Sequence, residues 1–171
     1  MPDQPSLTFL IGGARSGKSA HAEMLATAYP APWRYIATAQ AFDDEMVERI
    51  ALHRARRHDG WTTADAPYDL VGALEGAAAG QPVLVDCLTL WLSNHMLAES
   101  DLEGEFARLL AALAAPKGPW FVVANEVGFG IVPENALARR FRDAAGQLNQ
   151  RVAAIADRVL LMVAGIPVKV K

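Results

Sequence analysis

Residues 9–23 read FLIGGARSGKSAHAE, a short apolar run followed by a glycine-rich turn and an alanine-rich segment. Within them, Gly12-x-x-x-x-Gly17-Lys18-Ser19 fits the Walker A pattern. The glycines let backbone N–H groups converge on phosphate oxygens, and the following helix presents its positive dipole end to them. This stretch therefore predicts a P-loop for a nucleoside triphosphate. The nucleotide-binding residues expected in it are Gly12, Gly13, Ala14, Arg15, Ser16, Gly17, Lys18 and Ser19.

Two further roles follow from the P-loop. Lys18 is expected to act catalytically by reaching the β and γ phosphates, and Ser19 to hold Mg²⁺ through its hydroxyl. Residues 83–88, VLVDCL, form an apolar run that ends in Asp86, where a Walker B acid is expected. A charge on a buried strand needs a partner such as hydrated Mg²⁺. The alternative is that Asp86 caps the next helix. The predicted metal ligands are Ser19 and Asp86.

Short β-branched and apolar runs alternate with alanine-rich helical segments along the chain, which is typical of an α/β protein. We expect a P-loop NTPase (RecA-like) fold: a mostly parallel sheet with helices on both faces and a short antiparallel edge strand after Pro167. All 171 residues are expected to form one domain, with residues 1–6 loose. Strands are expected at 7–11, 34–38, 83–88, 120–125, 159–164 and 168–171. Helices are expected at 18–29, 43–57, 68–79, 88–97, 102–114 and 136–156.

The composition argues against several classes of protein: nucleic-acid binders with a large basic face, disulfide-rich proteins and membrane-spanning proteins. A net charge of −3 and 52% hydrophobic residues argue against a large basic face for nucleic acid. The single cysteine, Cys87, excludes a disulfide framework and a cysteine metal site. The longest apolar runs are interrupted by Asp86 and by Asp157 with Arg158, so no membrane span is expected. The start MPDQPS lacks the features of a signal peptide, and we expect a cytoplasmic protein.

Residues 43–61, DDEMVERIALHRARRHDGW, carry acids first and arginines last, as a helix dipole favours. The match between these charges and the helix dipole explains the charge pattern, so the pattern need not reflect a function. By helical spacing, Met46, Ile50 and His53 share one stripe, with arginines close by. Such a histidine is most often structural. Neighbouring guanidinium groups, however, favour a neutral imidazole, which is a competent nucleophile toward a phosphate.

Four segments carry a resemblance to a known family: GGARSGKS (12–19), YIATAQAFDDEMVERIALHRARR (35–57), NEVGFGIVPENALARRFRDAAGQLNQ (125–150) and GIPVKVK (165–171). Over nearly its full length the chain resembles the bifunctional adenosylcobinamide kinase / adenosylcobinamide-phosphate guanylyltransferase family of cobalamin biosynthesis. The P-loop alone is generic, whereas the other three segments in this order are highly specific.

The resemblance implies phosphorylation of adenosylcobinamide by ATP or GTP, then transfer of GMP from GTP to adenosylcobinamide phosphate through a covalent histidine guanylate. It also implies a homo-oligomer, a trimer. His53 matches the family histidine; some relatives have a second histidine where this chain has Leu52, and His58 is the nearby competitor. Some relatives carry Glu as the metal-binding acid at the end of the third strand. Asp86 stands at that position here and has a shorter side chain.

Other candidates remain open. Arg49, Arg54 and Arg57 are predicted to clamp phosphates around His53, or else to be solvated helix residues. Glu126 follows a strand at the end where open α/β sheets place ligand groups, so it either orients a hydroxyl or a metal-bound water, or braces its own loop. Two other functions stay in view: a simple small-molecule kinase without a covalent intermediate, and a nucleotide-dependent binding or switch module.

Overall fold

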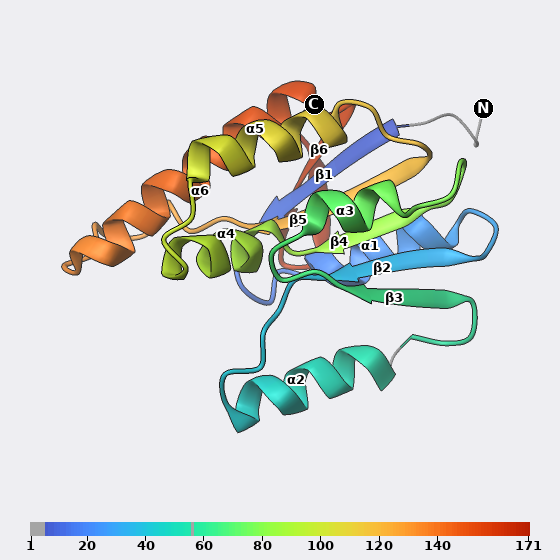
Figure 1. Ribbon diagram of the computed structural model, residues 1–171, viewed down its shortest axis with the longest axis horizontal. Coiled ribbons are helices and arrows are strands. Elements are labelled where there is room, and N and C mark those ends of the chain that lie inside the picture. The colour runs from blue at the N-terminus through green and yellow to red at the C-terminus, as the bar shows by residue number, and fades with distance from the viewer. Residues whose placement is uncertain (1–5, 56) are drawn as a thin grey trace.

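The computed structural model describes residues 6–55 and 57–171, and its centre is a seven-stranded sheet with helices on both sides (Figure 1). The strands are β1 (Ser6–Gly12), β2 (Trp33–Ala37), β3 (Trp61–Asp65), β4 (Val83–Asp86), β5 (Pro119–Asn125), β6 (Arg158–Val163) and β7 (Ile166–Lys169). The helices are α1 (Lys18–Thr27), α2 (Asp44–Ala55), α3 (Leu70–Glu75), α4 (Leu88–Leu97), α5 (Leu102–Leu113) and α6 (Ala136–Ile155).

The strand order is β3-β2-β4-β5-β1-β6-β7, and every neighbouring pair is parallel except β6 with β7. This confirms the predicted α/β fold with its antiparallel C-terminal edge strand. Parallel pairing also brings the carboxyl ends of the strands to one edge. There Asp65 pairs with Ala37, Ala37 with Asp86, and Gly12 with Asn125. Ligand groups of open α/β sheets gather at this edge.

Two apolar cores hold the layers together. On one face, small residues of α1, Ala22 and Ala26, pack over Leu10 and Phe121. On the other face, α3, α4, α5 and α6 cover the sheet in a larger core that contains the fully buried Trp91. Helix α2 differs from all of these, because none of its residues is buried and Figure 1 shows it apart from both layers. The sheet and its two helical layers therefore form the scaffold on which α2 is mounted.

The structure corrects several sequence-based boundaries. The edge strand β3 was not predicted; two of its five residues are half-buried and the others exposed, so it lacks an apolar signal. Ser6, expected in a loose N-terminus, begins β1, and its N–H donates to the Gly118 carbonyl. The strand predicted at 83–88 ends at Asp86 because Cys87 already begins the turn into α4. The helix predicted at 68–79 is only the six residues of α3, between its Asp69 cap and Gly76.

Across residues 6–55 and 57–171, none of the helices combines the length and apolar character needed to cross a membrane. The twenty-residue α6 is the longest of them, and of its four arginines Arg140 is exposed and the other three are half-buried.

Candidate active site

The predicted P-loop forms the turn between β1 and α1. Its last glycine, Gly17, has a φ of 91°, a left-handed conformation that favours glycine, and it caps the N-terminus of α1. A Cβ on Gly12 would lie 2.7 Å from the Met162 carbonyl oxygen, so the loop also needs glycine where it leaves β1. The loop residues Gly13, Ala14 and Arg15 are exposed, whereas Gly12, Ser16 and Lys18 are buried and Gly17 and Ser19 half-buried. The strand, turn and helix context of a P-loop is thereby confirmed.

Lys18 lies inside this turn with only 7% of its surface exposed, and its Nζ donates to the Gly13 carbonyl oxygen at 2.6 Å. Burial lowers the pKa of Lys18, an effect that the negative charge of Asp86 opposes and the positive charge of Arg49 reinforces. Both charges must be near Lys18 to act on it. The charges of Asp86 at the end of β4 and of Arg49 on α2 thus both act on the P-loop lysine.

Asp86 ends β4 with its carboxylate directed to β2, where Oδ2 accepts a 2.8 Å hydrogen bond from the Tyr35 hydroxyl. It does not cap α4, because the cap residue is Cys87 and no side-chain cap bond is present there. The end of β4 is held further by Thr38, whose Oγ1 accepts from the Cys87 N–H at 2.8 Å and donates to the Cys87 carbonyl at 2.6 Å. Asp86 is thus a half-buried acid on a rigid strand end.

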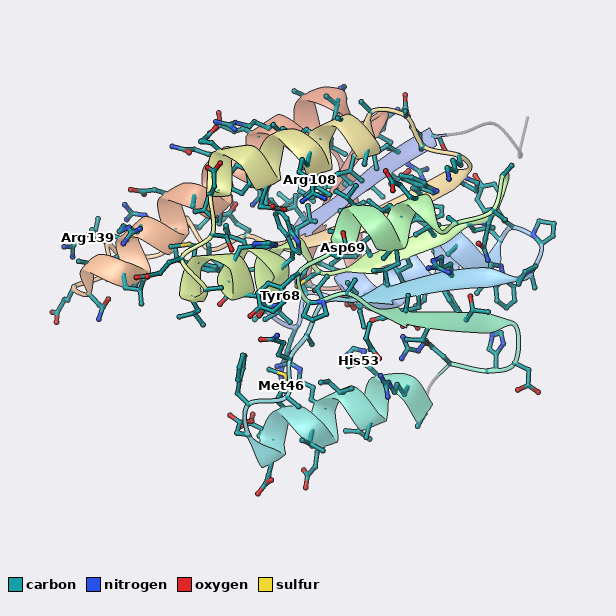
Figure 2. All side chains as sticks on the ribbon, viewed as in Figure 1. Met46, His53, Tyr68, Asp69, Arg108 and Arg139 are labelled. Carbon is teal, nitrogen blue, oxygen red and sulfur yellow. The ribbon has the colours of Figure 1, made fainter. Side chains whose placement is uncertain are left out.

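Helix α2 presents one side to the rest of the molecule. Met46, Ile50 and His53 are half-buried while most of the helix is exposed, which confirms the predicted stripe. Figure 2 shows Met46 and His53 projecting from α2 toward the sheet. Arg49 lies four residues before His53 on this helix, so the two share one side at helical spacing, whereas Arg57 lies beyond the end of α2. The Cζ of Arg57 lies 3.7 Å from the centroid of the Tyr35 ring.

The P-loop, His53 and Arg57 carry buried polar atoms without a hydrogen-bond partner. Among the described residues, five buried side-chain polar atoms lack such a partner, and three of them are Ser16 Oγ, His53 Nδ1 and Arg57 Nη1. Buried polar groups in folded proteins are nearly always paired. These three atoms are therefore candidates to pair with a polar ligand.

Arg54 is directed toward the end of β3. Its Nη2 makes hydrogen bonds of 2.9 Å to both carboxylate oxygens of Asp65, at the end of β3. More than half of each side chain is exposed, 52% for Arg54 and 63% for Asp65. The structure therefore places Arg54 in a surface ion pair that fastens α2 to the sheet edge, apart from the predicted phosphate clamp.

The substitution Arg54→Ala tests that placement. We expect the free energy of unfolding to fall by less than about 1 kcal/mol, because exposed ion pairs contribute little, and the affinity for GTP to stay within about twofold of wild type. Chemical denaturation and calorimetric titration with GTP measure the two quantities. Asp65→Asn is the matched control, since it removes the same ion pair and keeps the arginine. A loss of GTP affinity in Arg54→Ala alone would make Arg54 a phosphate ligand.

His58, the competitor of His53, lies at the opposite end of the sheet. Its ring packs edge-on against Trp33, the first residue of β2, with 5.4 Å between the ring centroids. The P-loop begins at the carboxyl end of β1. One strand of five residues separates the two ends of β2, a distance of roughly 13 Å at the usual rise per residue. The structure therefore places His58 at the amino end of β2, away from the carboxyl edge of the sheet where the P-loop begins.

Glu126 directly follows β5, and its N–H donates to the Gly12 carbonyl at 2.9 Å, so its backbone touches the start of the P-loop. Its carboxylate accepts a short hydrogen bond from the Gly128 N–H. This is the loop-bracing arrangement that the sequence left open beside a role in chemistry. The side chain is half-buried and next to the site, yet it already has a partner.

Tyr35 is the site residue that sequence reasoning missed. It appears in an apolar strand pattern, where a buried tyrosine needs no special explanation. The signal that could have found it is the register of two distant strands: Ala37 pairs with Asp86, so Tyr35, two residues earlier on β2, shares the face of Asp86. That register was not available from one sequence.

Solved structures of similar shape have little sequence in common with this chain. The flagellar accessory protein FlaH from Methanocaldococcus jannaschii has a TM-score of 0.54 at 12% identity, covering 98% of this chain and 79% of its own. The ATPase EscN of the enteropathogenic E. coli type III secretion system has a TM-score of 0.54 at 13% identity, covering 94% and 43%. These likenesses concern the fold, which is that of P-loop NTPases.

Proteins found by sequence comparison are much more similar to this chain than these structures are. The "Bifunctional adenosylcobalamin biosynthesis protein CobP" of Pseudomonas aeruginosa is 48% identical over 165 residues, 95% of each chain. The "Bifunctional adenosylcobalamin biosynthesis protein CobU" of Salmonella typhimurium is 41% identical over an alignment of 181 residues, covering 96% of this chain and 99% of that protein. Residues 8–170 match the family described as "Cobinamide kinase / cobinamide phosphate guanyltransferase". This chain belongs to that family of enzymes, which are kinases and nucleotidyltransferases acting in cobalamin biosynthesis.

Proposed function

We propose that the enzyme phosphorylates adenosylcobinamide with ATP or GTP and then transfers GMP from GTP to adenosylcobinamide phosphate through a covalent intermediate on His53. The observation that carries this proposal is the position of His53. Its Nδ1 is buried without a hydrogen-bond partner, on the side of α2 that also bears Arg49, whose charge acts on the P-loop Lys18. An unpaired imidazole nitrogen is a competent nucleophile toward phosphorus, and the proposal requires that it reach the α-phosphate of the bound triphosphate.

In the first half of guanylyl transfer, an unprotonated ring nitrogen of His53 attacks the α-phosphorus of GTP. A nitrogen–phosphorus bond forms, the bond from the α-phosphorus to its bridging oxygen breaks, and pyrophosphate leaves. In the second half, a phosphate oxygen of adenosylcobinamide phosphate attacks the same phosphorus, and the His53 ring leaves with its electron pair. Adenosylcobinamide-GDP is released and the free histidine is restored. Two successive displacements at one site predict ping-pong kinetics.

The kinase step uses a different phosphorus atom. The adenosylcobinamide hydroxyl oxygen bonds to the γ-phosphorus in line and loses its proton to water, while the bond from the γ-phosphorus to its bridging oxygen breaks and the nucleoside diphosphate leaves. The protein forms no covalent bond to the substrates in this step, so its main contributions are to position them and to stabilise the charge of the transition state. The buried Lys18 and the backbone N–H groups from Gly13 to Ser19 carry that role in both reactions.

The donor set at the P-loop fits Mg²⁺. This ion usually takes one or two protein oxygens and fills its other positions with water and phosphate. Ser19 supplies a hydroxyl at the start of α1, and Asp86 a half-buried carboxylate whose Oδ1 is left available by Tyr35. When bound, Mg²⁺ neutralises charge on the phosphates. Ser19 and Asp86 would hold it; the described part of the chain contains no group of three or more His, Cys, Asp or Glu side chains placed to bind a metal ion.

The proposal includes roles for two arginines and an oligomeric state. Arg49 and Arg57 flank His53 and are suited to bind phosphate oxygens. A homo-oligomer, a trimer by resemblance, is supported by apolar side chains that stand in solvent in the loop after β5, where Phe129 is 84% and Ile131 96% exposed. A cytoplasmic location remains the expectation.

GTP labelled with ³²P at the α-phosphate tests the proposal. We expect the protein to become labelled in the presence of Mg²⁺, and the label to resist alkali, to be lost in acid and to move to adenosylcobinamide phosphate when that acceptor is added. A simple kinase would transfer the γ-phosphate to adenosylcobinamide without labelling the protein. A switch module would bind GTP and form no product. Either result would overturn the covalent mechanism.

A further inference from the structure

Tyr35 connects the predicted metal ligand with the helix of the predicted nucleophile. Its hydroxyl donates to Asp86 Oδ2 at 2.8 Å, and its ring lies 3.7 Å below the guanidinium carbon of Arg57. The residue is only 4% exposed. One rigid side chain thus contacts the strand end that carries Asp86 and the segment that follows α2.

The sheet determines how Tyr35 is oriented. The β2–β4 register puts Tyr35 on the same face as Asp86. On the other side, the ring of Trp61 in β3 packs edge-on against Tyr35, with 6.0 Å between centroids. With Asp86 at the hydroxyl, Trp61 at the edge and Arg57 over the face, the phenol ring has little freedom to turn.

The surroundings of the Tyr35 hydroxyl suit its role as a donor. Burial raises the pKa of Tyr35, the nearby Asp86 carboxylate raises it further, and the Arg57 guanidinium opposes them to a smaller extent. A hydrogen bond from a buried hydroxyl to a carboxylate oxygen is a strong type of hydrogen bond.

Arg57 is two residues beyond the end of α2 and four residues after His53 in the chain. The cation–π contact with Tyr35 is buried on the arginine side, where Nη1 is inaccessible to solvent. The other contact that fastens α2 to the sheet edge, between Arg54 and Asp65, is exposed. The Tyr35 ring is therefore the more protected support of this helix.

On the basis of the proposed function, we propose that Tyr35 is a positioning residue with two separable tasks. Its hydroxyl orients the Asp86 carboxylate toward the nucleotide-bound metal ion, and its ring, through Arg57, holds α2 with His53 directed at the P-loop. The first task serves both phosphorylation and guanylylation. The second serves guanylylation alone, because phosphorylation does not use His53.

Two substitutions separate the tasks. Tyr35→Phe keeps the ring and removes the hydroxyl, whereas Tyr35→Leu removes both. Calorimetry with a non-hydrolysable GTP analogue, in Mg²⁺ and in EDTA, measures the first task without any turnover. We expect Tyr35→Phe to weaken binding about tenfold in Mg²⁺, the effect of losing one hydrogen bond to a charged group, and to leave binding in EDTA unchanged. Equal binding by wild type and Tyr35→Phe in Mg²⁺ would overturn this task.

The second task is measured at saturating Mg²⁺ as the rate at which GTP adds GMP to the protein, followed by intact mass. We expect Tyr35→Phe to label at about the wild-type rate and Tyr35→Leu about tenfold or more slowly, with phosphorylation of adenosylcobinamide less affected than labelling. Arg57→Ala removes the same stack without altering the core and also removes a proposed phosphate contact, so it should slow labelling at least as much as Tyr35→Leu, and the double variant should label no more slowly than Arg57→Ala. Labelling of Tyr35→Leu and Arg57→Ala at the wild-type rate would overturn it.

These outcomes are distinguishable from failure of the proposed function. If wild type never acquires GMP, the covalent mechanism is wrong, while the calorimetric comparison still decides whether the Tyr35 hydroxyl supports metal-dependent binding. Melting temperatures from circular dichroism identify any variant that does not fold. Should Tyr35→Leu be one of these, Arg57→Ala tests the ring contact by itself.

Discussion

His53→Ala is expected to abolish the transfer of GMP to adenosylcobinamide phosphate and to retain phosphorylation of adenosylcobinamide. Removing a covalent nucleophile costs on the order of 10⁴-fold or more in rate. The kinase reaction has no need of the imidazole, because the substrate hydroxyl is its nucleophile. The measurement is a pair of assays on the same preparation: ³²P from the α-position of GTP on the protein, and ³²P from the γ-position of ATP on adenosylcobinamide.

Loss of guanylylation with retained phosphorylation would show that His53→Ala removes a catalytic group and does not unfold the protein. His53 is half-buried on a helix with no buried residue, so its loss removes little packing. His58→Ala is the matched control, since that ring packs against Trp33 at the opposite end of β2 and should label at the wild-type rate. Undiminished labelling of His53→Ala would place the nucleophile elsewhere. Equal loss of both reactions would point to a structural role for His53.

Lys18→Met is expected to abolish both reactions. The lysine is the buried cation of the P-loop, and loss of one preorganised charge at a developing anion typically lowers the rate by about 10²–10³-fold. Methionine has a similar length and no charge. Steady-state assays of phosphorylation and single-turnover labelling of the protein measure the two losses, and both should fall together because one P-loop serves both.

The stability of this variant supplies the control. Burial lowers the pKa of Lys18, so the folded state holds the lysine charge less favourably than water does. Replacing it with an apolar side chain of similar shape should therefore leave the free energy of unfolding equal or raise it. Retained phosphorylation in a stably folded Lys18→Met would remove the P-loop lysine from the chemistry. A variant that is inactive and unstable would contradict the burial argument.

Local signals predicted the scaffold well. The P-loop could be identified because its glycines, lysine and serine act within eight consecutive residues, between a strand and a helix that the same pattern requires. The stripe of Met46, Ile50 and His53 was predicted from helical periodicity and is the less exposed side of α2. Strand β3 was missed because an edge strand exposed along most of its length has no apolar alternation.

The sequence by itself determined the fold class, the family and the position of the phosphate-binding turn, since each depends on residues close together in the chain. The tertiary structure alone decided the order of the strands, the pairing of Arg54 with Asp65, and the contacts of Tyr35 with Asp86 and Arg57. Asp86 lies 51 residues beyond Tyr35, and the two meet through the pairing of β2 with β4. Such contacts depend on which strands become neighbours, and that is set by packing across the whole sheet rather than by any local stretch of sequence.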